Sequence, residues 1–335
     1  MDQLSTKPIG TGPFVFQEIV PGERVTLTRN ADYWDKPYPY VDRVVMDILP
    51  EPIVQVTALQ RGEVDLVWQV SLPHVPLLEA SPKLAVQRTG SATWDGVVMD
   101  TTVAPFNDVR VRQALNVAID RKKIVDAVLF GYGHPALINL AASDDVYPKS
   151  LPVPAADPAK AKALLKEAGY PDGIKLTLAI PSLDRRTRNA LGLTLQDMWR
   201  AAGINVVVQV YTWDRFVSEI EGKAPFFVSG WTGRQFPDAG LYPFWHSTGS
   251  WNTTSGGWRY KNPEVDTLLE AARRDVNVES RKKSYEHLAN ILQRDVPVII
   301  PYVMDVINAH SRRVRDFQVH PKVGYLDFTR VWLAD

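Results

Sequence analysis

The residues best able to do binding chemistry lie in one stretch, Pro225–Tyr260, where charged groups stand among tryptophans and glycines. Arg234 and Asp238 lie close to several large rings, although charged side chains are rarely buried without a partner. A short apolar run, Phe226–Val228, precedes them and is typical of a buried strand. A buried strand followed by an aromatic, glycine-containing loop presents rings and backbone to a ligand. We interpret this stretch as a candidate ligand site; the alternative is a tryptophan-rich core segment.

Five residues of the stretch are candidates for ligand contact. Arg234 could offer its planar guanidinium to a carboxylate, or it could pair with Asp238 and only shape the loop. Trp231 could cover a ligand as a lid. Gly233 and Trp245 complete the candidates from this stretch.

Further candidates follow two other expected strands. Arg185 and Arg186 come after a strand that ends at Ile180, with Arg188 close behind. They could be the solvated start of a helix, but the amino end of a helix prefers anions, so a bound anion would explain them. Trp213 follows the strand that ends at Tyr211 and could either contact a ligand or pack in the core.

The residue types give little support to catalysis, metal binding or a cofactor. The chain has no cysteine, which excludes disulfides, thiolate catalysis and cysteine-ligated metals. Its 6 histidines include no pair at helical spacing, so we expect no metal site. Gly10–Gly12 precedes a proline and a strand, so this segment is not a phosphate loop. The enzyme alternative is a carbohydrate-active hydrolase that uses two of Asp214, Glu219 and Asp238, but the sequence does not fix their separation.

Composition describes an ordinary globular chain of 335 residues with more than one domain. Lys+Arg and Asp+Glu both number 38, so the balance gives no support to nucleic-acid binding. The longest apolar run, around Val298–Met304, is far shorter than the roughly 20 residues of a membrane-spanning helix. Met1–Leu4 is polar, so we expect no signal peptide within this chain.

Helical and strand patterns alternate through the middle of the chain, which favours α/β layers with parallel crossovers. The expected helices are 52–60, 73–80, 108–118, 120–129, 157–168, 189–202, 212–221, 262–274 and 278–293. The expected strands are a hairpin within 8–30, then 43–49, 64–67, 84–88, 96–99, 174–180, 204–211, 226–228 and 296–304. An extended aromatic tail covers 312–335.

Several motifs occur in the order of one known family. They are Pro8–Phe14 (PIGTGPF), Arg29–Trp34 (RNADYW), Gln60–Asp65 (QRGEVD), Pro105–Leu115 (PFNDVRVRQAL), Ala118–Arg121 (AIDR) and Asn262–Asp266 (NPEVD). With these motifs the chain resembles the peptide-type extracellular solute-binding proteins, family 5, of ABC importers. The resemblance covers nearly all of the chain, and its specificity comes from the complete set.

The resemblance implies a two-lobed α/β fold of the type II periplasmic-binding-protein class. Residues 1–95 and about 310–335 would be the remnant of the first lobe, and residues 96–309 the second lobe. The resemblance also implies that the N-terminal part of the first lobe is missing. The implied function is non-enzymatic capture of a peptide-like solute by hinge closure and delivery to the permease, in the periplasm. The cargo alternatives are an opine, an oligosaccharide or a metal chelate.

The resemblance also bears on Arg234. Peptide-binding relatives often carry Trp-x-x-Asp here, with the aspartate holding the α-amino group of the peptide. This chain has Trp231-Thr232-Gly233-Arg234 instead, which resembles the glutathione-binding branch and implies a carboxylate partner. A basic residue near Arg185 meets the ligand carboxylate in relatives.

Overall fold

The computed structural model describes residues 8–141, 144–149, 151–182, 187–234 and 236–335. The chain divides into two compact units. Unit 1 comprises residues 1–89, 306–320 and 324–335, and unit 2 comprises residues 90–305 and 321–323. The lobes expected from the sequence had their boundaries near residues 95 and 310.

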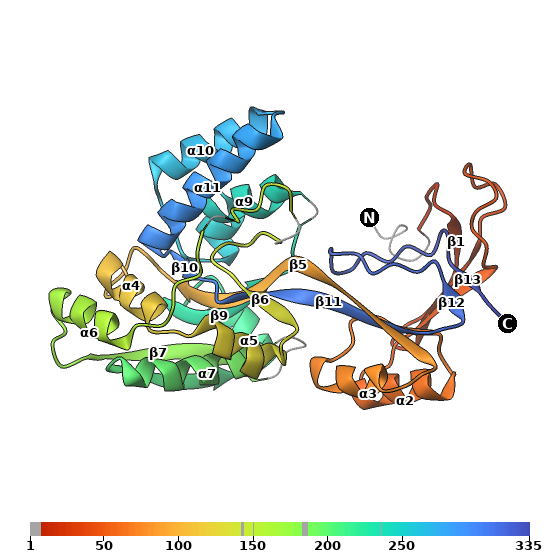
Figure 1. Ribbon diagram of the computed structural model, residues 1–335, viewed down its shortest axis with the longest axis horizontal. Helices are drawn as coiled ribbons and strands as arrows, with labels where there is room; N and C mark the ends of the chain where they lie inside the picture. Colours follow the sequence, from red (N-terminus) through yellow and green to blue (C-terminus); the bar gives the residue numbers. More distant parts are fainter. Residues whose placement is uncertain (1–7, 142–143, 150, 183–186, 235) are drawn as a thin grey trace. The chain divides into compact units, whose positions relative to one another are not determined.

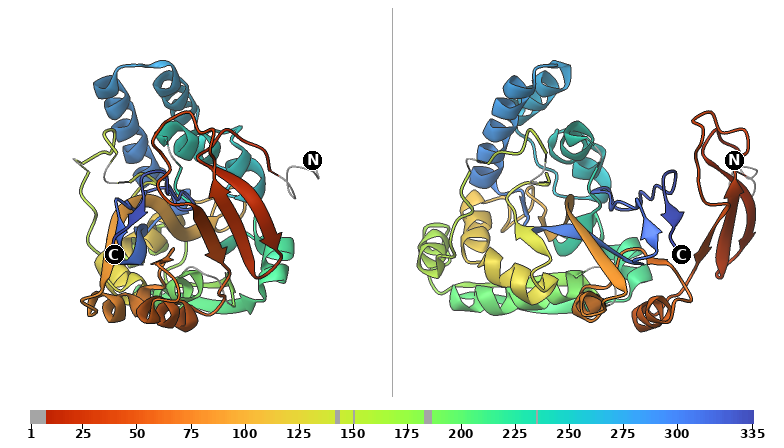
Figure 2. Two further views of the ribbon diagram at one scale, coloured as in Figure 1. Left: turned by 90° about the vertical axis from the view of Figure 1, so that its right-hand side faces the viewer. Right: turned by 45° about the vertical axis from the view of Figure 1, so that its right-hand side comes forward.

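Unit 1 is built around a small antiparallel sheet with the order β1-β2-β3, seen as three neighbouring strands in Figure 2. A turn at Gly22, whose φ of 79° suits glycine, joins the first two strands of the expected hairpin. The elements of this unit are β1 (Phe14–Val20), β2 (Arg24–Arg29), β3 (Arg43–Asp47), α2 (Pro52–Arg61), β4 (Leu66–Val67), η1 (Leu72–His74), α3 (Val75–Glu79), β12 (Val314–Arg315) and β13 (Trp332–Leu333).

Two long strands contribute residues to both units: β5 (Leu84–Met99) and β11 (Tyr302–Ser311). The sequence predicted two separate strands where β5 is continuous, and this prediction was wrong. The strand continues through the buried Ser91, whose hydroxyl donates to the Met304 carbonyl at 2.7 Å. The expected strand 296–304 is instead divided into β10 (Val298–Ile299) and β11, because Pro301 between them has no N–H to donate.

Unit 2 contains a mixed sheet in which β11, β5, β9, β7 and β8 are successive neighbours. Its remaining elements are α4 (Val109–Val117), α5 (Arg121–Leu129), β6 (Gly133–Pro135), α6 (Pro158–Glu167), β7 (Ile174–Pro181), α7 (Arg188–Ala201), β8 (Ile204–Tyr211), α8 (Trp213–Arg215), η2 (Phe216–Ile220), β9 (Phe226–Trp231), α9 (Pro237–Trp245), η3 (Trp251–Ser255), α10 (Pro263–Arg274) and α11 (Val278–Asp295). Helix α7 packs against β7, β8 and β9, and α10 pairs with α11 (Figure 1).

Local sequence signals explain where these helices begin. Asp157 accepts a hydrogen bond from the Lys160 backbone N–H, with Pro158 in the first turn of α6. Asn262 caps α10 in the same way through the Glu264 N–H. Asp108 and Asp120 cap α4 and α5 through the backbone N–H groups of Arg110 and Lys123. These four caps confirm the corresponding helix starts.

Candidate functional site

Three strands of unit 2 run in the same direction and end at one edge of the sheet. β7 is parallel to β8, with Pro181 opposite Tyr211, and β7 is also parallel to β9. We call the end of these strands, together with the segments that follow, the carboxyl edge. Trp213 follows β8, and Trp231–Arg234 end or follow β9. In open α/β sheets ligands bind outside the carboxyl ends of parallel strands, so the topology brings most of the candidates to a suitable place.

The ring of Trp231 belongs largely to the core of unit 2. It is 5% exposed and packs against Trp94 and Trp258 at centroid distances of 5.0 and 5.4 Å. Trp245 is 1% exposed, and its indole N–H donates to the Asn139 side-chain oxygen at 2.8 Å. Ligand contact by either residue remains a proposal. In the structure their rings fix the end of β9 and α9.

The expected long loop after β9 is in fact partly helical. Pro237 opens α9, and a second short helical segment, η3, follows at Trp251–Ser255. The loop prediction was wrong because Gly240 and Pro243 interrupt the helical pattern. A signal for the helix was nevertheless present: proline followed by an acidic residue is typical of a first helical turn.

Gly233 and Arg234 have opposite surroundings. A Cβ on Gly233 would lie 2.8 Å from the Ala92 carbonyl carbon, and the Gly233 N–H donates to Thr93 Oγ1 at 3.0 Å. Arg234 is exposed and makes no ion pair or hydrogen bond with any described residue. The backbone is therefore held one residue before an exposed guanidinium.

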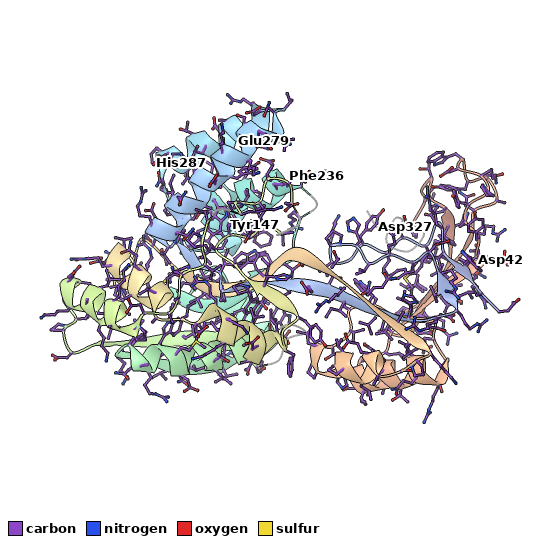
Figure 3. All side chains as sticks on the ribbon, viewed as in Figure 1. Asp42, Tyr147, Phe236, Glu279, His287 and Asp327 are labelled. Carbon is purple, nitrogen blue, oxygen red and sulfur yellow. The ribbon has the colours of Figure 1, made fainter. Side chains whose placement is uncertain are left out.

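The alternative ion pair between Arg234 and Asp238 is not formed. Asp238 Oδ1 instead lies 3.1 Å from Arg273 Nε, and both side chains are partly exposed. Asp238 thus joins α9 to α10, and its charge is already compensated. Phe236, which directly precedes α9, is 64% exposed and adds a free ring to the carboxyl edge (Figure 3).

A buried ion pair lies behind the carboxyl edge. Asp95 of β5 is completely buried and lies 3.2 Å from Arg188 Nε, in the first turn of α7. The same guanidinium donates to the Gly230 carbonyl at 2.9 Å. Thr187 donates to Asp95 Oδ2 at 3.2 Å, and its hydroxyl is 2.9 Å from that of Tyr302. Arg188 is therefore a buried structural residue, and the aspartate offsets the poor placement of a cation at a helix amino end.

Arg188 also reaches Trp213. Its guanidinium carbon is 5.6 Å from the centroid of this ring, within the range of a cation–π contact. Trp213 is 45% exposed and so keeps surface available for a ligand. Arg185 and Arg186 lie outside the described residues.

The sequence reading missed Asp95 as a residue of this site. Its signal was an acidic side chain in an otherwise apolar strand, between Trp94 and Val97. The partner was not evident, because Arg188 lies 93 residues away in the chain.

The described residues support neither a metal site nor a catalytic role for Glu219 as a protonated acid. They contain no group of three or more potential ligands that could hold a metal ion. Glu219 accepts from Arg215 at 2.8 Å, and this hydrogen bond lowers the pKa of the carboxyl group. A glycosidase acid needs the opposite shift. Among the residues that the structure describes, no helix is both long and apolar enough to cross a membrane.

An open groove of about 860 Å³ lies in unit 1, between β-sheet residues and the C-terminal segment. Tyr40, Arg43 and Trp332 are among its lining residues. Asp42, which also lines it, pairs with Arg29 at 3.0 Å (Figure 3). None of the site candidates from the sequence lies in this groove.

Comparison with known proteins places the chain in a family. Residues 2–252 match the model described as "Bacterial extracellular solute-binding proteins, family 5 Middle". Heme-binding protein A of Haemophilus influenzae is 31% identical over 304 residues, which are 89% of this chain and 55% of that protein. Glutathione-binding protein GsiB of Pectobacterium atrosepticum is 30% identical over 331 residues, which are 95% of this chain and 63% of that protein.

A solved structure agrees with these matches. The periplasmic binding protein DppA from Helicobacter pylori, in complex with the peptide STSA, superposes with a TM-score of 0.84 at 27% identity. The match covers 99% of this chain and 64% of that protein. The chain thus spans between 55% and 63% of the length of the two curated relatives.

Proposed function

Because the chain belongs to the bacterial extracellular solute-binding proteins of family 5, we propose that it captures a peptide-like solute for an ABC importer. The protein would act in the periplasm and deliver this solute to the transmembrane permease. Relatives named for binding glutathione and a solved relative holding the peptide STSA support this class of cargo.

The observation that carries the proposal is the composition of the carboxyl edge. The exposed guanidinium of Arg234 and the exposed rings of Trp213 and Phe236 lie in the segments that follow β8 and β9. The backbone just before Arg234 is held by the hydrogen bond from the Gly233 N–H to Thr93 Oγ1. Rings and a small number of polar groups on a rigid sheet are the usual composition of a small-molecule site.

We further propose that the protein binds its solute without turning it over. Two of the three acids considered for a hydrolase are held in ion pairs: Glu219 with Arg215, and Asp238 with Arg273. Neither is arranged as a protonated acid opposite a second carboxylate.

Titration calorimetry of the 335-residue chain tests the proposal. The titrants are the peptide Ser-Thr-Ser-Ala, glutathione, haem and a neutral tetrasaccharide, and chromatography of each mixture after prolonged incubation tests for turnover. We expect saturable binding of a peptide-like titrant with no product. Binding of haem or the tetrasaccharide without either peptide, or of none of the four, would refute the peptide assignment, and a product would refute the receptor role.

A further inference from the structure

We propose that Asp95 is the positioning residue of the ligand site: its buried carboxylate holds the first turn of α7 and the end of β9 in one arrangement. The contacts that carry this inference all lie within unit 2. Asp95 binds Arg188 and Thr187 directly, and Arg188 passes the constraint to Gly230 and Trp213. One carboxylate therefore controls three segments that meet at the carboxyl edge. This inference rests on the proposed function, because it assumes that the edge binds the solute.

The ion pair is difficult to explain as a device for stability. The side chains of Asp95 and Arg188 are 0% and 7% exposed, so both charges have lost their water. Desolvation of two ions commonly cancels their attraction, and apolar residues of similar volume often stabilise a core as well. What an apolar pair could not provide is the set of directed hydrogen bonds to Thr187 and the Gly230 carbonyl.

Steric fit adds a second, independent constraint. A Cβ on Gly230 would lie 1.9 Å from Asp95 Oδ1 and 2.4 Å from the Trp94 carbonyl oxygen. The carboxylate thus occupies the space that any side chain at position 230 would need. Since Gly230 directly precedes Trp231, the placement of Asp95 also sets where the backbone leaves the sheet toward Arg234.

The test compares Asp95→Asn with a matched control, Asp100→Asn. Asn keeps the size of the side chain and removes its charge. Asp100 directly follows the carboxyl end of β5, next to the amino end of β9, and is also a buried aspartate, paired with Arg259 at 2.5 Å. It contacts none of the segments at the carboxyl edge that are named above, so its substitution reports the general effect of removing the charge of a buried aspartate that has an arginine partner.

Two measurements separate positioning from general stability. Hydrogen exchange without ligand should be at least about tenfold faster in Asp95→Asn at the amides of 187–190 and 230–234, and unchanged there in Asp100→Asn. Calorimetry with Ser-Thr-Ser-Ala and glutathione should show about tenfold weaker binding for Asp95→Asn only, since a loosened edge must be ordered on binding.

A double variant tests whether Asp95 acts through Arg188. Adding Asp95→Asn to Arg188→Gln should weaken binding by less than about twofold more, because the two residues belong to one network. Equal exchange at 230–234 in both aspartate variants would overturn the positioning role, whatever the ligand result. Localised fast exchange together with unchanged affinity would overturn the link to the solute. A wild-type chain that binds neither titrant would contradict the proposed function, while the exchange data would still decide the structural claim.

Discussion

Replacing Arg234 with alanine should weaken binding of solutes that carry a free carboxylate. The guanidinium is exposed and has no partner among the described residues, so a ligand need not break an existing ion pair to reach it. A charge-assisted hydrogen bond that is desolvated on binding contributes about 1.5–3 kcal/mol. With each tenfold change in affinity worth about 1.4 kcal/mol, the expected loss is roughly one to two decades.

A purely superficial contact would give a different magnitude. Ion pairs between solvent-exposed groups contribute about 0.2–1 kcal/mol, which is less than roughly fivefold in affinity. The size of the measured loss therefore distinguishes an arginine enclosed with its ligand from one that only attracts it. Raising the salt concentration should reduce the superficial contribution far more than the enclosed one.

The assay is titration calorimetry with Ser-Thr-Ser-Ala in two forms, with a free and with an amidated C-terminus. Arg234→Ala should lose affinity for the free acid and almost none for the amide. Arg274→Ala is the matched control, since it removes the same charge from a side chain of unit 2 that is 81% exposed. Equal losses for the two forms of the peptide, or a loss of the same size in the control, would refute carboxylate recognition by Arg234.

Three further substitutions follow from the packing and titration of unit 2. Gly233→Ala should destabilise the fold by about 1–3 kcal/mol in chemical denaturation, because the new Cβ would lie 2.8 Å from backbone atoms. The control Gly240→Ala in α9 has only contacts of 3.8 Å or more and should be neutral or stabilising. Similar losses of stability in the two variants would contradict this prediction. Trp245→Phe should cost about 1–3 kcal/mol, since it leaves the buried oxygen of Asn139 without its donor, and an unchanged midpoint would show that the bond is dispensable. Burial alone would raise the pKa of Asp295, but hydrogen bonds outweigh it and the pKa is lowered from 3.8, so its contribution to stability is present above about pH 4 and lost as pH falls through the lowered value. Asp295→Asn should therefore destabilise the protein at pH 7 and progressively less in more acidic buffer, and a pH-independent loss would contradict the linkage.

The regular elements could be predicted because their signals are local. A capping residue followed by proline predicts a helix start, and the structure has both such caps, at Asp157–Pro158 and Asn262–Pro263. The alternation of strand and helix through residues 174–211 predicted parallel crossovers, and β7 and β8 are indeed parallel. Such features depend on a few neighbouring residues, all of them readable from the chain.

The site was predictable only in outline. The residue types at positions 213, 231 and 234 indicated a binding surface, but their exposure depends on packing that the sequence does not display. Trp231 and Trp213 are the same residue type beside similar strands, yet they are 5% and 45% exposed. The difference arises because Trp231 meets rings from distant segments, such as Trp94 and Trp258. Asp95 was missed for the same reason, since its meaning lies in a partner far along the chain.

The contrast between Gly230 and Arg234 has a consequence for how this site can change over generations. Position 230 is filled by a neighbouring carboxylate, so almost any replacement there disturbs the fold before it alters the ligand. Position 234 is exposed and has no partner among the described residues, so it can accept a new charge or shape at little structural cost. Two positions only four residues apart therefore differ in tolerance: position 230 excludes side chains, and position 234 can accept many of them. Single substitutions at position 234 can therefore change the charge and shape of the carboxyl edge while the sheet beneath it stays unchanged.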